Sequence, residues 1–379
     1  MTRVTVYSKF DDLSPAFRVL FYHCSQREGF FLSFPWFRHL TEAGMDRQIQ
    51  LRIYGLDVDA EPNQATIHAA LTLCHEKPLM SLLKVRVLRA VTNYYSGGFG
   101  PILDEEINHP NTQFPHPTQQ MQLNLLADAI SAELPRWDMI DLHPVVKNSP
   151  AFQLLTTAFN HAGMAVESYF CSGNWTLKVL QRNYQQYFDG LPSRLRHTLA
   201  RKAAQLNRES RFRLEIITSE SEAKDRIAIY LQIYENSWKE REPYPDFVPG
   251  WILESARHHW LRLGIAYIDD QAAAAQVWLV QEHKASIYKL AHDARFEHTS
   301  VGSLLTAHLM RHVIDTDRVQ EVDFLNGDES YKQDWMSHRN EYWGVIAFNR
   351  KTIKGQLAYG LQRASRHFKQ VFRSAPTTG

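Results

Sequence analysis

The order of predicted strands and helices repeats once along this chain. The first half predicts a three-stranded meander, then a helix, a strand, a helix and a strand, with meander strands over 51–56, 66–74 and 85–91. The second half predicts another meander, then a helix and a strand that form a crossover, with meander strands over 265–268, 273–281 and 285–292. Short runs of alternating apolar residues support these strands. Two copies of one α/β fold account for the repeat.

The length agrees with two copies, because 379 residues exceed one ordinary hydrophobic core. We expect two lobes, residues 1–184 and 185–379, each with a mixed, partly antiparallel sheet flanked by helices. The second lobe is expected to end in a basic helix, since 350–379 carries Lys and Arg but no Asp or Glu. Other helices are predicted over 118–133, 149–162, 194–208, 220–238, 251–263 and 331–338.

Composition excludes several classes of protein. The formal net charge is +1, so no field of the whole molecule draws it to nucleic acid or membrane. Three widely spaced cysteines form neither a disulfide framework nor a metal pair, which favours the reducing cytoplasm. The first residues lack the apolar core of a signal peptide, and no run approaches the roughly 18 apolar residues of a membrane span. Adjacent His258 and His259 point in different directions on a helix, so we predict no metal site.

Polar residues gather after the last predicted strand of the crossover, which covers 319–324. Asp323 is flanked by apolar residues in that strand, and Asp328 follows in the turn. Tyr331 and Lys332 begin the next helical segment. Ligands collect at the carboxyl ends of strands in open α/β sheets, so this strand end is a candidate site. A Tyr phenol can protonate a thiolate leaving group, and Lys332 can neutralise a phosphate; a capped turn with an Asp328–Lys332 ion pair is the alternative.

A second candidate is the helix start at Val301, Gly302 and Ser303. The first turn of a helix leaves backbone N–H groups free at the positive end of the helix dipole, which suits an anion. Glycine allows a phosphate to approach the backbone closely. The alternative is an ordinary helix start. The segment is neither a Walker loop nor a dinucleotide-binding glycine fingerprint, so neither function is supported.

These pieces occur in one order along the second half, and that order resembles a known family. The ordered residues are Tyr288, His292-Asp293, Val301-Gly302-Ser303-Leu304-Leu305, Asp323-Phe324-Leu325, Gly327-Asp328, Tyr331-Lys332 and Trp335. Residues 185–350 resemble GNAT-type acyltransferases, of the branch named for CelD-like cellulose-biosynthesis proteins. Residues 1–180 resemble the family only in element order. The Fem-type peptidyltransferases carry two GNAT-like lobes in one chain, as the repeat suggests here. Of the family's usual pyrophosphate signature, only Gly302 remains.

The resemblance implies N-acyl transfer from acyl-CoA to an amine on a small molecule or a saccharide precursor. Acyl-CoA is then a co-substrate, and no permanently bound cofactor is expected. The donor's phosphates would meet Val301, Gly302, Ser303 and Lys332. Asp323 or Asp328 is the implied base, with His292 as a further one, and Tyr331 is the implied acid.

The sequence indicates several candidates for acceptor binding and more than one possible donor. Trp36, Trp238 and His292 are candidates for acceptor binding, although Trp36 also fits a hydrophobic core. The basic segments 194–208 and 350–379 fit a charged tRNA as the donor of an aminoacyl group, or solvated and packed helices. A third hypothesis is a non-catalytic GNAT-like protein that assists polysaccharide assembly.

Overall fold

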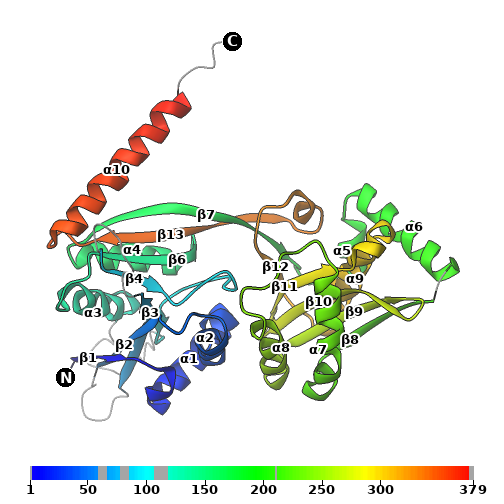
Figure 1. Cartoon of the computed structure of the whole chain (residues 1–379), viewed down its shortest axis with the longest axis horizontal. Helices are drawn as coiled ribbons and strands as arrows, with labels where there is room; N and C mark the ends of the chain where they lie inside the picture. The colour runs from blue at the N-terminus through cyan, green and yellow to red at the C-terminus, as the bar shows by residue number, and fades with distance from the viewer. Residues whose placement is uncertain (1, 59–65, 77–84, 106–117, 210, 375–379) are drawn as a thin grey trace. The chain divides into compact units, whose positions relative to one another are not determined.

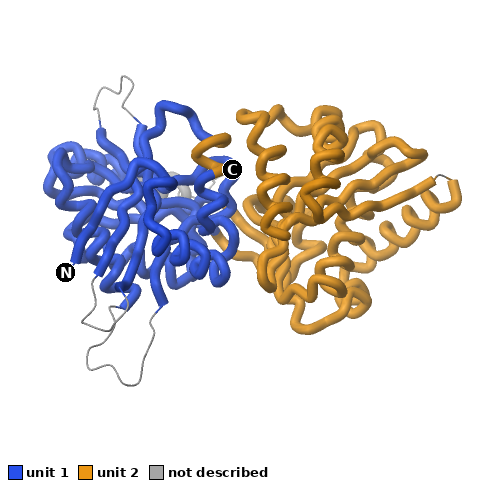
Figure 2. The backbone as a smooth tube through the Cα atoms, turned by 90° about the horizontal axis from the view of Figure 1, so that it is seen from below, with its two compact units in different colours: residues 1–38, 45–171, 342–379 blue, residues 39–44, 172–341 orange. Residues whose placement is uncertain are grey.

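A computed structural model describes the chain except residues 1, 59–65, 77–84, 106–117, 210 and 375–379, and except the side chains of 365–374 (Figure 1). The chain forms two compact units (Figure 2). The N-terminal unit comprises Met1–Arg38, Met45–Cys171 and Tyr342–Gly379. The C-terminal unit comprises His39–Gly44 and Ser172–Glu341.

The N-terminal unit contains one mixed sheet and helices. Its strands, in spatial order, are β1 (Thr2–Tyr7), β2 (Gln50–Val58), β3 (Ile67–His75), β4 (Val87–Ala90), β6 (Met139–Val146) and the end of β13 (His338–Phe348). Neighbours are antiparallel except β4 and β6, which are parallel, and β5 (Ile102–Leu103) pairs with β3. The helices are α1 (Pro15–Glu28), α2 (Phe34–Ala43), α3 (Gln119–Ala132), α4 (Pro150–His161) and α10 (Ile353–Ser374). α2 continues into the C-terminal unit.

The C-terminal unit also has one mixed sheet. Its strands, in spatial order, are β8 (Phe212–Ile217), β9 (Leu261–Ile268), β10 (Gln271–Gln281), β11 (Lys284–His292), β12 (Glu321–Asn326) and the end of β7 (Ala165–Lys178). Among these described strands, β11 and β12 are parallel neighbours and the other neighbouring pairs are antiparallel. The helices are α5 (Tyr184–Asp189), α6 (Ser193–Glu209), α7 (Glu220–Glu235), α8 (Phe247–Arg257) and α9 (Val301–Arg311). Short helical segments are η3 (Ala294–Thr299), η4 (His312–Thr316) and η5 (Ser330–Asp334).

The two units repeat one order of elements, which confirms the expected pair of α/β copies. Each has a first strand, two helices, a three-stranded meander, a helix, and a strand parallel to the third meander strand. In the sheet, an antiparallel strand lies beyond that parallel strand in each unit, β13 next to β6 and β7 next to β12. In the C-terminal unit, α6 and α9 pack on one face of the sheet, whereas α7 and α8 contact β10 and β9.

The compact units differ from the lobes expected at 1–184 and 185–379. β7 begins in the N-terminal unit and ends in the C-terminal one, and β13 runs the opposite way. The chain therefore crosses between the units at these strands, and a single cut does not separate them. The basic C-terminal helix is present as α10, and Tyr342–Gly379 clusters with the N-terminal unit.

Two helices predicted from the sequence are wrong in part. The helix expected over 251–263 ends at Arg257; His259 then takes a left-handed φ of 60°, and β9 begins at Leu261. The spacing of apolar residues alone favoured a helix in this segment. In the structure the segment is a strand because it pairs with β10. The segment expected over 331–338 is the short 3₁₀ helix η5, followed by β13. Within the described residues, no helix combines the length and apolarity needed to cross a membrane.

Candidate active site

The parallel pair β11 and β12 diverges soon after it forms. Three residue pairs are in register, Lys284–Ser286 with Glu321–Asp323. β11 then continues to His292 and β12 to Asn326, and no further pair between them is in register in the described part of the chain. Where two parallel strands separate, backbone N–H and C=O groups of the exposed edge become available to an extended polar ligand.

The start of α9 lies next to the end of β11. Ser300 adopts a left-handed φ of 59°, and α9 begins at Val301, so Val301, Gly302 and Ser303 form its first turn. The Gln276 amide donates to the carbonyl oxygen of Gly302 at 2.9 Å and fixes the helix to β10. A Cβ at Gly302 would lie 3.6 Å from Nδ1 of His292. The helix start thus offers backbone donors beside His292.

His292 and Trp238 are in contact at the same place. Their ring centroids lie 4.4 Å apart at an interplanar angle of 40°. The Asn236 amide donates to Asp293 at 3.2 Å, which ties the segment after α7 to the end of β11. Burial lowers the pKa of His292, so its imidazole is neutral near pH 7 and can accept a proton. The structure therefore brings together three residues predicted from the sequence: Gly302, Trp238 and His292.

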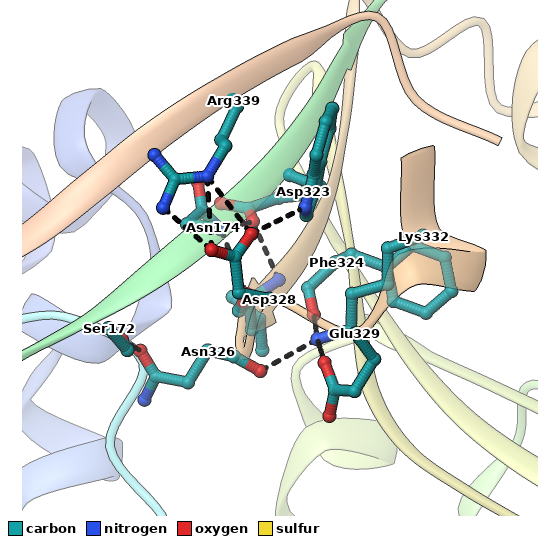
Figure 3. Close-up of polar contacts among 11 residues, drawn as sticks. Ser172, Asn174, Asp323, Phe324, Asn326, Asp328, Glu329, Lys332 and Arg339 are labelled. Atoms are coloured by element: carbon teal, nitrogen blue, oxygen red, sulfur yellow. Dashed lines mark hydrogen bonds and ion pairs between the residues drawn. The ribbon is translucent and has the colours of Figure 1, made fainter. Parts of the chain in front are cut away.

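Asp323 is buried and its carboxylate is fully engaged (Figure 3). One oxygen accepts hydrogen bonds from the Asn174 amide at 2.6 Å and from the Leu325 N–H at 2.8 Å. The other lies 2.6 Å from the Lys284 ammonium. These contacts connect β7, β11 and β12 at the point where β11 and β12 diverge. They favour a structural role for Asp323 over the base expected from the sequence.

Asp328 also has fixed partners. Arg339 binds both carboxylate oxygens, with contacts of 2.6, 3.0 and 3.1 Å, and the Trp175 indole donates at 3.0 Å (Figure 3). The hydrogen bonds from Arg339, followed by that from Trp175, hold the pKa of Asp328 below its usual range. A carboxylate stabilised in its charged form is a weak base, so Asp328 is a poor candidate for proton abstraction.

Lys332 does not meet the expectation of a phosphate ligand. Its side chain is buried, and its ammonium donates to the carbonyl oxygen of Asn326 at 2.8 Å and pairs with Glu329 at 2.9 Å (Figure 3). It also lies 5.3 Å from the Phe324 ring centroid. The Asp328–Lys332 ion pair considered from the sequence is replaced by Lys332–Glu329. The Lys332 side chain therefore stabilises the turn after β12 through the Asn326 carbonyl oxygen and Glu329.

Tyr331 is partly exposed beside the end of β12, and its role as the acid stays a prediction. Its side chain is 43% exposed and its ring meets Phe324 edge-on, with centroids 5.7 Å apart. Burial, together with the nearby charge of Glu329, raises the pKa of Tyr331 to about 12. The phenol is therefore protonated at neutral pH and can donate its proton to a leaving group.

Trp36 is fully buried in the N-terminal unit, in edge-on contact with Phe30 and Phe31. This placement is the hydrophobic-core alternative and corrects the expectation that Trp36 contacts an acceptor. Ser33 accepts a hydrogen bond from the Trp36 N–H at 3.2 Å at the start of α2. Among the described residues, no three His, Cys, Asp or Glu side chains are grouped to hold a metal ion.

Sequence reasoning missed three charged residues near this site. Glu242 follows α7 and forms a buried ion pair of 2.7 Å with Lys289 of β11. Lys239 lies close enough for both of them to act on its pKa. Lys289 itself was a usable signal, because it is a charged residue that stands in a strand between Tyr288 and Leu290. The charged run from Lys239 to Glu242 gave none, because it is typical of a solvated loop.

Comparison with known proteins identifies the class. Residues 193–333 match the family model described as acetyltransferase (GNAT) domain. FemX is 11% identical, with 95% of this chain and 99% of that chain covered at a TM-score of 0.60. L-PGS from Bacillus licheniformis is 9% identical, with 95% and 98% covered at a TM-score of 0.50. A conserved protein of unknown function from Bacteroides thetaiotaomicron VPI-5482 is 8% identical, with 91% and 100% covered at a TM-score of 0.51.

At such low identities these structures show a shared fold and no shared substrate. A search of curated protein sequences gave no match. The chain is thus an α/β protein with tandem GNAT-like copies. Its C-terminal unit carries a GNAT domain. The resemblance to the CelD-like branch stays a prediction.

Proposed function

We propose that the chain is an N-acyltransferase that moves an acyl group from acyl-CoA to an amine. The observation that carries this proposal is the placement of the first turn of α9 beside the unpaired edge of β11. The free N–H groups at Val301, Gly302 and Ser303 suit the pyrophosphate of CoA. The edge of β11 suits the amide-rich pantetheine arm, which binds as an added strand would.

The chemistry follows from the protonation states at the site. A neutral amine attacks the thioester carbonyl carbon, the C–N bond forms, and the C–S bond breaks. His292 has a neutral imidazole and takes the proton that the amine loses, directly or through water. Tyr331 gives its proton to the departing thiolate and is reprotonated by solvent. The products are an amide and free CoA. The acceptor is an amine on a small molecule or a saccharide precursor, and Trp238 lies beside His292 to contact it.

The leading alternative is an aminoacyl group donated by a charged tRNA. It is supported by the basic, exposed side of α6, where Arg194, Arg201 and Arg208 are exposed. A non-catalytic protein that assists polysaccharide assembly is the alternative outside enzymes. It requires neither donor.

A thermal-shift screen with CoA, several acyl-CoAs and bulk tRNA tests the proposal. A ligand that binds only the folded state raises the unfolding temperature by mass action. CoA and at least one acyl-CoA are expected to raise it, whereas tRNA is not. A shift with tRNA that disappears with salt, without a shift with any CoA, would transfer the assignment to the tRNA-dependent class. No shift with either ligand would favour the non-catalytic protein.

A further inference from the structure

Five charged side chains of the C-terminal unit gather near β11 and β12, and four of them act on the pKa of the fifth, Lys239. They are Lys239, Glu242, Lys289, Glu329 and Lys332. Lys289 pairs with Glu242 and Lys332 pairs with Glu329, at 2.7 and 2.9 Å. Lys239 is the third cation, and the cluster therefore carries one positive charge in excess when all its groups are ionised. None of these residues is needed for the acid and base steps proposed above.

The two carboxylate oxygens of Glu242 differ, because one has an ionic partner and the other has no hydrogen-bond partner. Its side chain is 10% exposed, and its Oε1 accepts the Lys289 ammonium. Its Oε2 is buried and lacks a hydrogen-bond partner. Buried polar atoms in folded proteins almost always have a donor or acceptor, and a buried carboxylate oxygen has the strongest need for one. Oε2 is thus placed to accept a hydrogen bond from a ligand, and an ammonium group is the best donor.

Lys239 supplies the complementary charge, an ammonium group without a carboxylate partner among the described residues. No carboxylate of the described residues lies within ion-pair distance of its ammonium. Burial, followed by the neighbouring charge of Lys289, lowers the pKa of Lys239, so the cation is held in an unfavourable setting. A carboxylate or another anion on a ligand would stabilise it.

Taking the acyl-transfer proposal as given, we infer that this cluster binds the acceptor and that the acceptor is a zwitterion, an amino acid or a compound with both an amine and a carboxylate. Glu242 receives the ammonium and Lys239 the carboxylate. Trp238 precedes Lys239 in sequence and contacts His292, so the cluster lies near the proposed base. Glu242 has a binding role, and the proton of the amine passes to His292 or water as above.

The competing reading is a purely internal pair. A rotation of the Lys239 side chain would let it bind Oε2 of Glu242, and each would then satisfy the other. In that case substitution of either residue changes stability and leaves ligand binding untouched. The two readings therefore differ in a measurable way.

The test is calorimetric titration of the full chain, with and without CoA. The probes are glycine, β-alanine and 4-aminobutyrate, and for each the matching simple amine and simple carboxylic acid. We expect at least one amino acid to bind about tenfold or more tighter than either half-molecule. Glu242→Gln is expected to weaken the amino acid and the amine, and Lys239→Met the amino acid and the acid. Glu240→Gln, an exposed acid in the same segment, is the control and should bind as the wild type does.

Several outcomes would overturn the inference. They are a failure of all three amino acids to bind, equal binding of an amine alone, and variants that lower only the unfolding midpoint while binding persists. The proposed acyl transfer is judged separately by CoA. If CoA binds and no amino acid does, the acyltransferase stands and the zwitterionic acceptor fails. If an amino acid binds and CoA does not, the binding site stands and the donor is wrong.

Discussion

Asp141 and Asp323 take the same place in the two units. Each is the last residue in register with its parallel neighbour, Asp141 opposite Arg89 and Asp323 opposite Ser286. Each also binds a side chain of β7, the Tyr169 hydroxyl at 2.6 Å and the Asn174 amide at 2.6 Å. The aspartate at the divergence of the parallel strands is therefore a repeated structural element. This equivalence supports a framework role for Asp323 and directs the search for a base to His292.

Lys332→Met should destabilise the protein without weakening CoA binding. The substitution removes the buried ammonium that satisfies the carbonyl oxygen of Asn326 and pairs with Glu329. Leaving buried polar groups unpaired costs about 1–3 kcal/mol of the free energy of unfolding. Urea denaturation measures that loss, with the exposed Lys351→Met as the control. Unchanged stability together with weaker CoA binding would restore Lys332 as a phosphate ligand.

Gly327→Ala should cost more than Gly163→Ala. Both glycines have positive φ, 120° and 79°, so alanine is strained at each. A Cβ at Gly327 would also clash with Glu329 and lie 2.7 Å from the Lys332 ammonium, whereas Gly163 has open space. The difference between the two unfolding free energies isolates the close contact, and we expect about 1–3 kcal/mol. Equal losses would show that the turn after β12 adapts without cost.

Tyr331→Phe should lower kcat for acyl transfer by about 10²-fold or more and leave the fold intact. The pKa of Tyr331 is raised to about 12, so the wild-type rate should show no alkaline decline from this group in the ordinary range. Tyr22→Phe, another exposed tyrosine, is the control. Full activity of Tyr331→Phe would remove it from the chemistry.

Acid should destabilise the C-terminal unit through histidines before its carboxylates titrate. Burial lowers the pKa of His292, His308 and His312 from the ordinary value of 6.5. The unfolded chain then binds more protons than the folded chain, so their contribution is complete above 6.5 and is lost as pH falls through the lowered values. Urea midpoints near pH 8 and near pH 5 measure this loss of stability, and a constant midpoint would contradict the prediction.

The kcat/KM of the wild type should fall over the same pH range, because His292 is the proposed base. Asp328→Asn should not move that decline.

Two of the helix starts could be predicted well, because their causes are local. Helices were expected from 118 and from 149, and Thr118 and Ser149 cap α3 and α4 through their side chains. The sequence misplaced the boundary between α8 and β9, since only pairing with β10 distinguishes strand from helix there.

At the site, the sequence indicated residues that the structure places close together, but not the contacts that Asp323 and Lys332 make. Gly302 and His292 belong to the ordered motifs and lie close together, and Trp238 contacts His292. The engagement of Asp323 and the burial of Lys332 depend on partners such as Asn174 and Glu329, which spacing along the chain does not specify. The unpaired oxygen of Glu242 is a property of the folded state, and no pattern in the sequence indicates it.

Calorimetric titration of CoA into the wild type, Gly302→Val and Gly360→Val tests the proposed donor site most directly. Both glycines lie in helices, and a Cβ at Gly302 makes only an ordinary contact with His292, so the fold should tolerate both changes. A branched side chain in the first turn of α9 should keep the pyrophosphate from the backbone N–H groups and weaken CoA about tenfold or more. Gly360→Val should bind CoA as the wild type does. Absence of CoA binding to the wild type, or equal binding by Gly302→Val, would contradict a donor site at the start of α9.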